Sequence, residues 1–255
     1  MRSDPIRVLH LTDPHLFAAP DGNLRGANTR ETLAAVIDHY LAATWRADLI
    51  AMTGDVVQDD SEAAYQRFLD LLGPLGLPVH CVPGNHDVRQ VMREKLATHP
   101  FFYCQAEEVG DWLLIGIDSC VDNGAGGEVA STEMDRLAGT INATTAQHVA
   151  VFLHHPPLPM QSRWLDQVGL KNGKEFLRNL SLSGKVRVVL FGHVHQEFFA
   201  ETERIKIIGT PSTCRQFKPR SEEFALDDMP PAYRQVELFA DGSVITKLNW
   251  IASDE

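Results

Sequence analysis

The feature that most constrains the fold of this chain is a series of six short apolar segments, five of which end in polar clusters. The segments are rich in Val, Ile and Leu, which predicts buried β-strands. In open α/β sheets, ligands bind beyond the carboxyl ends of the strands, so clusters that are distant in sequence can converge on one crevice. The six segments are residues 6–11, 49–52, 79–82, 112–117, 149–153 and 186–191.

Amphipathic stretches between these segments predict helices. Asn28 with Glu31 three residues later resembles a capping box, Ser61 precedes a second helical pattern, and Asn172 with Glu175 precedes a third. Strands that alternate with helices indicate the α/β class. Each pattern places its apolar side chains on one helical face: Leu33, Val36, Ile37, Tyr40 and Leu41, then Tyr65, Phe68, Leu69 and Leu72, then Phe176, Leu177 and Leu180.

The C-terminal part of the chain has a different pattern. Asp241-Gly242 between the apolar stretches 233–239 and 243–250 predicts a β-hairpin, and the polar stretch 215–231 predicts a long loop. No composition change marks a domain boundary, so we expect residues 1–255 to form a single domain. A domain of this size needs no disulfides for stability.

Charge and cysteine usage exclude several partners. The net charge of -11, with no basic run, repels nucleic-acid backbone and anionic lipid, so we expect neither nucleic acid nor membrane as a partner. The chain has no run of about 18 apolar residues, so we expect no membrane span. The four cysteines have neither zinc-site spacing nor a secretory context, which favours reduced thiols and a cytoplasmic protein. The sequence gives no indication of oligomeric state.

The polar clusters themselves indicate a metal site. They offer oxygen and imidazole nitrogen with no thiolate, a set that suits zinc, iron or manganese. Each cluster is a weak signal alone, because an Asp-x-His pair occurs by chance and Gly-Asp often marks a turn. Their joint occurrence after successive strands indicates one site, whereas His10, His39, His80, His99 and His148 are expected to be structural. The clusters are Asp13-Pro14-His15, Gly54-Asp55, Gly84-Asn85-His86-Asp87, His154-His155 and Gly192-His193-Val194-His195.

This succession of motifs resembles the calcineurin-like metallophosphoesterase superfamily, with every motif position present. Finer features resemble one branch, the bacterial class III 3',5'-cyclic-AMP phosphodiesterases. The branch features are Gly26-Ala27-Asn28-Thr29, Gly54-Asp55-Val56-Val57-Gln58-Asp59, His154-His155-Pro156-Pro157-Leu158-Pro159, Gly192-His193-Val194-His195-Gln196, Pro211-Ser212-Thr213-Cys214 and Gln216-Phe217-Lys218-Pro219.

The resemblance implies a four-layer α/β/β/α sandwich with a dinuclear metal site at the carboxyl ends of the strands. It implies two divalent or mixed-valence ions (Fe, Mn or Zn). Asp13, His15 and His195 then hold one ion, Asn85, His154 and His193 hold the other, and Asp55 bridges them. His155 follows ligand His154, and adjacent residues in an extended segment point opposite ways, so His155 is expected to orient a ligand or touch substrate.

The resemblance and the ligand chemistry together imply a mechanism. Two ions acidify a shared water and clamp the phosphoryl oxygens, so a hydroxide held between them attacks phosphorus. Catalytic roles are expected for Asp55 and for His86, which donates a proton to the leaving oxygen or stabilises transition-state charge. The alternative for His86 is a hydrogen bond that closes the turn, and Asp87 is expected to fix an imidazole or the turn. The residues expected to contact substrate are His15, Asp55, Asn85, His86 and His195.

The implied function is hydrolysis of 3',5'-cyclic AMP to 5'-AMP by a cyclic-nucleotide phosphodiesterase. One alternative is a phosphodiesterase for glycerophosphodiesters or other small linear diesters. Another is a catalytically inactive metal-binding scaffold, against which the intact ligand set with His86 argues. We expect substrate choice to depend on residues 25–29, 155–159 and 215–231 around the site.

Overall fold

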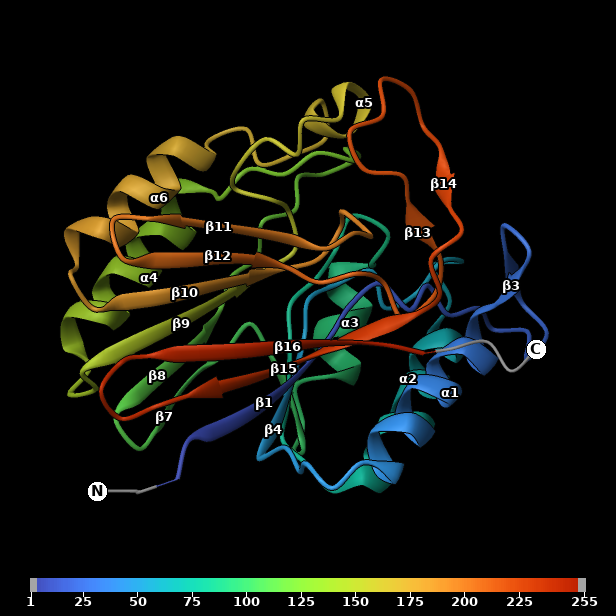
Figure 1. Ribbon diagram of the computed structural model, residues 1–255, viewed down its shortest axis with the longest axis horizontal. Coiled ribbons are helices and arrows are strands. Elements are labelled where there is room, and N and C mark those ends of the chain that lie inside the picture. The colour runs from blue at the N-terminus through green and yellow to red at the C-terminus, as the bar shows by residue number, and fades with distance from the viewer. Residues whose placement is uncertain (1–3, 252–255) are drawn as a thin grey trace.

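The structure is a computed structural model that describes residues 4–251. Two six-stranded sheets pack face to face, and helices cover both outer faces (Figure 1). The predicted four-layer α/β/β/α sandwich is therefore confirmed. The strand orders are β16-β15-β1-β4-β5-β6 and β11-β12-β10-β9-β8-β7.

The first sheet is parallel from β1 to β6 and ends in an antiparallel hairpin, β15–β16, as the sequence predicts. Three helices and a short 3-10 turn connect its strands. The strands are β1 (Ile6–Leu11), β4 (Leu49–Met52), β5 (Val79–Cys81), β6 (Phe101–Tyr103), β15 (Ala232–Leu238) and β16 (Val244–Trp250). The helices are α1 (Thr29–Ala42), α2 (Glu62–Leu72), the 3-10 turn (Gly73–Leu75) and α3 (Arg89–Lys95).

The second sheet has four parallel central strands, and antiparallel strands β7 and β11 form its edges. Its strands are β7 (Ala106–Val109), β8 (Trp112–Gly116), β9 (His148–Leu153), β10 (Val186–Phe191), β11 (Phe198–Thr202) and β12 (Ile205–Gly209). Its helices are α4 (Ser131–Ala143), α5 (Arg163–Asp166) and α6 (Gly173–Leu182).

Side-chain alternation along the central strands fills three apolar layers. In β1, Leu9 and Leu11 pack under the helices of the first sheet, whereas Val8 packs between the sheets. In β9, Val151 faces the second helical layer and Phe152 faces the other sheet. Successive strand residues point to opposite faces. Because both faces of these strands are buried, the sequence is continuously apolar there.

Two of the three predicted helix starts are confirmed. The Asn28 side chain accepts hydrogen bonds from the backbone amides of Arg30 and Glu31, and Ser61 accepts one from Ala64. The third prediction is wrong in its detail. Asn172 precedes α6, but its side chain bonds the backbone amide and carbonyl of Val129 instead of capping the helix, and so ties α6 to the segment before α4.

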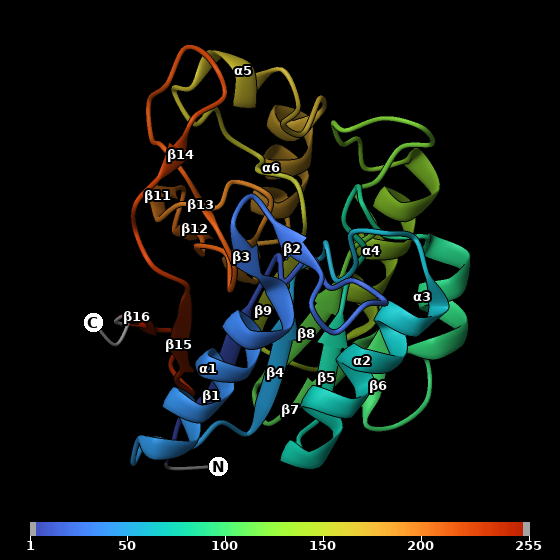
Figure 2. The same cartoon turned by 90° about the vertical axis from the view of Figure 1, so that its right-hand side faces the viewer.

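The sequence patterns missed α3, α4, α5, β6, β12 and both edge strands of the second sheet. The edge strands alternate between exposed and partly buried residues, so they lack the apolar run that marks a central strand. The predicted long loop at 215–231 contains a small two-stranded ribbon, β13 (Gln216–Phe217) with β14 (Leu226–Asp227). A second ribbon, β2 (Asn23–Leu24) with β3 (Ala27–Asn28), precedes α1. Figures 1 and 2 both show α5 beside the β13–β14 segment.

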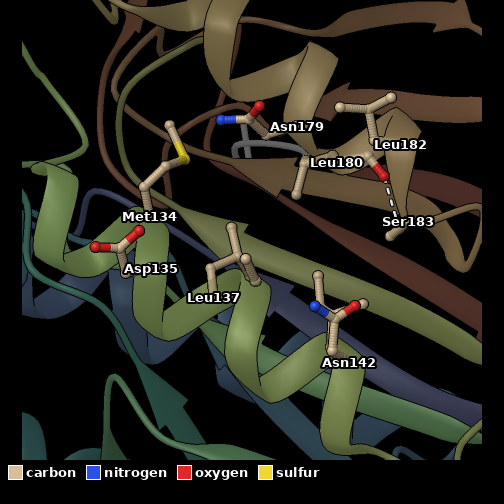
Figure 3. Close-up of a pocket in the computed structure, with 10 residues that line it drawn as sticks. Met134, Asp135, Leu137, Asn142, Asn179, Leu180, Leu182 and Ser183 are labelled. Atoms are coloured by element: carbon tan, nitrogen blue, oxygen red, sulfur yellow. Dashed lines mark hydrogen bonds between the residues drawn. The ribbon is translucent and has the colours of Figure 1, made fainter.

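A hollow of about 310 Å³ lies between α4 and α6 (Figure 3). Its lining includes apolar side chains such as Met134 and Leu137 and the polar side chains of Asn142 and Asn179. None of the predicted site residues lines it. In the part of the chain that the structure describes, no helix has the length and apolar character needed to cross a membrane.

Candidate metal centre

The predicted ligands come together at the carboxyl ends of five strands. Each lies in the loop that directly follows a central strand. All seven are buried except Asn85, which is partly exposed. Asp13 and His15 follow β1, Asp55 follows β4, Asn85 follows β5, His154 follows β9, and His193 and His195 follow β10.

The first ligand group consists of Asp13, His15 and His195. The Nε2 atoms of His15 and His195 are 3.1 Å apart, and Oδ1 of Asp13 lies 3.2 Å from His195 Nε2 and 3.8 Å from His15 Nε2. His195 Nδ1 donates to the carbonyl oxygen of Arg215 at 2.6 Å. Because Nδ1 carries the proton, the neutral ring directs an unprotonated Nε2 at the other two residues.

The second ligand group consists of Asn85, His154 and His193. His154 Nε2 lies 3.2 Å from Asn85 Oδ1 and 3.1 Å from His193 Nδ1. His154 Nδ1 donates to the carbonyl oxygen of Thr53 at 2.7 Å, which again leaves Nε2 free to bind a cation. This geometry supports His154 over His155 as the inward-facing imidazole.

Asp55 lies between the two groups. Its Oδ2 atom is 3.7 Å from His15 Nε2 in the first group and 3.4 Å from His154 Nε2 in the second. Its Oδ1 atom accepts a hydrogen bond from the backbone amide of His86 at 2.9 Å. One carboxylate therefore faces both groups, which is the position a bridging ligand needs.

The donor chemistry fits two cations. Ligand atoms of Asp13, His15 and His195 lie within 4.8 Å of one another, as do those of Asp13, Asp55 and His154 and those of His154, His155 and His193. Two imidazole nitrogens 3.1 Å apart repel each other unless a proton or a cation lies between them. Among the described residues, His15 Nδ1 and His193 Nε2 are buried without a hydrogen-bond partner. Oxygen and imidazole donors suit zinc, iron or manganese.

The carboxylates of the site are held in their charged form. Burial raises the pKa of Asp13, but the charge and hydrogen bond of His195 outweigh burial and lower that pKa to about 2. The pKa of Asp55 is also lowered, since His154 and His15 outweigh burial. The site therefore offers two negative charges to cations in a region that otherwise excludes water.

The backbone at the site is strained. Five of the predicted ligands have positive φ angles between 45° and 68°, a region that costs non-glycine residues free energy. They are Asp13, His15, Asp55, His193 and His195. Two glycines permit close approach as well: a Cβ at Gly84 would lie 2.1 Å from Asp55 Oδ1, and one at Gly192 would lie 2.0 Å from Thr12 Oγ1. Strain of this kind is concentrated at functional sites.

His86 lies beside the first group. Its ring is edge-on to His15, with centroids 5.1 Å apart, and Gln58 Nε2 is 3.2 Å from its Nδ1. An amide nitrogen only donates, so Nδ1 accepts and the neutral ring carries its proton on Nε2. A ring in this state presents Nε2–H as a hydrogen-bond donor, and transfer of a proton to an ester oxygen requires the imidazolium form.

Asp87 holds the turn that carries Asn85 and His86. Its carboxylate accepts hydrogen bonds from the backbone amides of Val56 and Gly84 and from the Tyr65 hydroxyl. None of these three hydrogen bonds comes from an imidazole. Of the two roles expected for Asp87, the structure favours fixing the turn.

His155 is fully buried beside the second group. Its Nδ1 atom pairs with Ser119 Oγ at 2.9 Å, and its ring centroid lies 4.9 Å from those of His154 and His193. Within residues 4–251, its Nε2 atom has no hydrogen-bond partner. Complete burial favours packing against the ligand rings over contact with substrate.

Sequence reasoning missed the groups that orient the ligands. Thr12 Oγ1 donates to Asp13 Oδ2 at 2.5 Å, and the backbone carbonyls of Thr53 and Arg215 fix two imidazoles. A carbonyl is available whatever the residue type, so no sequence pattern marks it. The structural role expected for the other histidines agrees with His10, which bonds Thr53 and Thr210.

A cleft of about 450 Å³ opens beside the ligand groups. Asn85 and His86 line it, with Arg89 and Cys120 among the residues on its other walls. Arg89 forms ion pairs with Asp118 and Asp122. The cleft thus brings the proposed proton donor and one predicted metal ligand to a surface that a small molecule can reach.

Comparison with known proteins identifies the family. Residues 6–197 match the calcineurin-like phosphoesterase family. The chain belongs to this family. Within it, the chain is 36% identical over 251 residues to the 3',5'-cyclic adenosine monophosphate phosphodiesterase CpdA of Haemophilus influenzae, covering 98% of this chain and 92% of that protein. It is also 36% identical to the Escherichia coli K12 protein of the same name, covering 97% and 90%.

Solved structures of the family share the fold. A dimetal phosphatase from Danio rerio superposes with a TM-score of 0.65 at 14% identity, covering 98% of this chain and 100% of that one. At this identity the likeness concerns the fold alone. It agrees with the two-sheet sandwich that carries the site.

Proposed function

We propose that this phosphoesterase hydrolyses 3',5'-cyclic AMP to 5'-AMP with two metal ions. One observation carries the proposal: the seven predicted ligands form two groups that share Asp55. The near full-length similarity to two bacterial cyclic-AMP phosphodiesterases supports the substrate. The complete set of predicted ligands also favours an active hydrolase over a catalytically inactive scaffold.

The proposed ligand assignment follows the two groups. Asp13, His15 and His195 would hold one ion, as their mutual distances indicate. Asn85, His154 and His193 would hold the other, and Asp55 would serve both. Iron, manganese and zinc all suit this oxygen and nitrogen set.

When bound, two such ions polarise the phosphoryl oxygens and acidify water for attack on phosphorus. The chain's own residues then complete the reaction. We assign His86, acting as the imidazolium, as the proton donor to the departing 3' oxygen, because it lines the cleft beside the ligand groups; the transfer leaves its ring neutral. Asp87 keeps His86 in place by fixing the turn.

The size and charge of the surroundings support a small substrate. The cleft beside Asn85 and His86 has a volume of about 450 Å³, and the chain carries a net charge of -11. A polymer with many phosphates is repelled by that surface, whereas one cyclic diester needs only the local field of the bound ions. Cyclic AMP therefore fits better than DNA or RNA.

Product analysis tests the proposal. Protein stripped with a chelator and reconstituted with Mn²⁺ should bind two ions and convert cyclic AMP to 5'-AMP, and in ¹⁸O-labelled water the label should appear in the phosphate of 5'-AMP. The stripped protein should be inactive. Formation of 3'-AMP would contradict the proposed leaving group. Absence of cyclic-AMP turnover by protein that holds two ions would contradict the proposed function.

A further inference from the structure

Residues 211–217 contact two ligands of the same proposed ion. We call this segment the clasp. The sequence pattern singled out its Pro211-Ser212-Thr213-Cys214 and Gln216-Phe217 portions, but the proposed reaction uses neither. The clasp follows β12 and runs into β13, and its side chains at 212, 213, 214 and 216 are buried.

One end of the clasp holds the backbone at Asp13. Ser212 Oγ donates to the Asp13 carbonyl at 2.7 Å, and the Thr213 amide donates to the Thr12 carbonyl at 3.0 Å. Asp13 has a φ of 53°, an unfavourable angle for a non-glycine residue. These two bonds help to hold the strand end in that conformation.

The other end of the clasp holds His195. The Phe217 amide donates to the His195 carbonyl at 2.9 Å, and the Phe217 ring stacks on the imidazole with centroids 4.0 Å apart and planes 10° from parallel. The Arg215 carbonyl accepts from Nδ1 on the same ring. The stack restricts rotation of the imidazole, and the carbonyl selects the tautomer.

Gln216 locks the clasp itself. Its Oε1 atom accepts from the Ser212 amide at 3.0 Å, and its Nε2 atom donates to the carbonyls of Ser212 and Pro230 at 2.8 and 3.0 Å. A buried amide with its hydrogen bonds made is a rigid link. The two ends of the clasp are therefore held at a fixed separation.

Phe217 is in turn held by an aromatic cluster. Trp164 of α5 and Phe224 contact its ring edge-on, with centroids 5.2 and 5.3 Å away, and the Arg25 guanidinium lies 4.3 Å from the centroid of Phe224. The proximity of α5 to β13 is visible in Figures 1 and 2. The ring that stacks on His195 is therefore supported from its edges.

We propose that Phe217 is a positioning residue for the ion held by Asp13, His15 and His195. Its ring keeps His195 Nε2 directed at Asp13 and His15, so in the metal-free protein this imidazole is already oriented to bind the ion. Loss of the ring should lower the affinity for this ion and leave the affinity for the ion of Asn85, His154 and His193 nearly unchanged. The inference rests on the metal centre of the proposed function. Supporting contacts of this kind typically change metal affinity by roughly 10–100-fold.

Calorimetric titration of metal-free protein with Mn²⁺ tests this inference. In Phe217→Leu, one binding event should weaken by about tenfold or more, and the other should change by less than about threefold. Phe217→Tyr, which keeps a flat ring, should restore wild-type binding. Phe102→Leu is the matched control, because it removes a ring that stacks on His80, an imidazole that is not one of the predicted ligands.

Three outcomes would overturn the inference: both events unchanged in Phe217→Leu, both weakened equally, or the same loss in Phe102→Leu. Thermal melting of the metal-free variants establishes that each is folded. If Phe217→Leu does not fold, Phe217→Met decides, since it keeps apolar volume without a flat ring. The titration uses no substrate, so failure of the protein to cleave cyclic AMP would count against the proposed function alone.

Discussion

At the scale of single residues, Asp55 has the most demanding position. Its Oδ2 faces both ligand groups, and its Oδ1 is bonded to the amide of His86. A carboxylate in this position can neutralise two cations and also hold the turn that carries the proton donor. Binding of the cations needs the negative charge of Asp55, whereas an uncharged oxygen can still accept the hydrogen bond from the His86 amide. Replacement of Asp55 by Asn therefore separates the two roles.

Replacement of Asp55 by Asn should lower metal content and activity together. The amide keeps the size of the side chain but removes the negative charge that two cations share, so at least one ion should be lost. Elemental analysis after dialysis and cyclic-AMP turnover are the measurements. Asp38→Asn, on the exposed face of α1, is the control. Two bound ions and normal turnover in Asp55→Asn would end the dinuclear account.

The His86 prediction separates proton donation from metal binding. His86→Ala should keep both ions, because the ring's own partner is Gln58 and the Asp55 contact is made by the backbone amide. It should lose about 10²–10⁴-fold in rate on cyclic AMP, whose leaving group is an alkoxide, and far less on an aryl ester that leaves without a proton. Equal losses on both substrates would indicate a structural or purely electrostatic role.

The convergence of the polar clusters could be predicted from the sequence because each cluster lies at the end of an apolar strand. The groups that orient the predicted ligands could not. Thr53 and Arg215 act through backbone carbonyls, and Phe217 meets His195 only after 21 residues of intervening chain fold back. Such contacts depend on tertiary packing, which residue type does not encode locally.

At the scale of secondary-structure elements, burial on both faces decided much of what the sequence could predict. Central strands such as β1 and β9 pack between two apolar layers, so their sequences are largely apolar. Strand β12 is an exception, since it is also largely buried but was missed. The edge strand β7 has no residue with a fully buried side chain, and α3 is short. Elements with few apolar contacts have a weak hydrophobic pattern in the sequence, although they are as regular in the structure as the central strands.

The link between α2 and the turn at residues 84–87 gives a prediction at this scale. The Tyr65 hydroxyl donates to Asp87 at 3.0 Å and accepts from the Val88 amide at 2.9 Å. Tyr65→Phe leaves both groups short of a partner, so the free energy of unfolding should fall by about 1–3 kcal/mol. Because the turn carries Asn85 and His86, kcat should also fall while both metals stay bound.

Urea unfolding and steady-state kinetics measure the two effects of Tyr65→Phe. The control is Tyr233→Phe, which removes a hydroxyl that bonds His39 instead. The control should lose some stability but keep normal kcat. A normal kcat in Tyr65→Phe as well would show that the turn does not need this contact.

At the scale of the whole molecule, His10 joins the two sheets. Its ring bonds Thr53 at the end of β4 and Thr210 at the end of β12, which belong to different sheets. Burial, together with the charge of Arg234, outweighs the charge of Asp13 and lowers the pKa of His10 to about 3. His10 is therefore neutral in the folded protein across the physiological range.

This burial predicts acid sensitivity. In the unfolded chain His10 binds a proton below the ordinary histidine pKa of about 6.5. In the folded chain it binds a proton only near pH 3 and below. The contribution of His10 to stability is thus present above about pH 6.5 and is lost as pH falls toward 3. Between about pH 7 and pH 5 this single group should account for roughly 2 kcal/mol of lost stability.

The measurement is urea unfolding of chelator-treated protein at both pH values, for wild type and His10→Gln. The variant should be less stable at neutral pH because it disturbs the bonds to Thr53 and Thr210. Its further loss on acidification should be smaller than that of wild type by roughly 2 kcal/mol. An identical pH dependence in both proteins would show that His10 is not kept neutral by the fold.

Selectivity is also a property of the whole molecule, because the cleft, the clasp and the ligand groups come from segments spread along the chain. We infer that the cleft and the two ligand groups together favour a cyclic nucleotide. This is tested by kcat/KM of Mn²⁺-reconstituted protein for cyclic AMP and for linear glycerophosphodiesters under one set of conditions. We expect cyclic AMP to have the higher value and to yield 5'-AMP. A linear diester preferred by tenfold, about 1.4 kcal/mol of transition-state stabilisation, would contradict it.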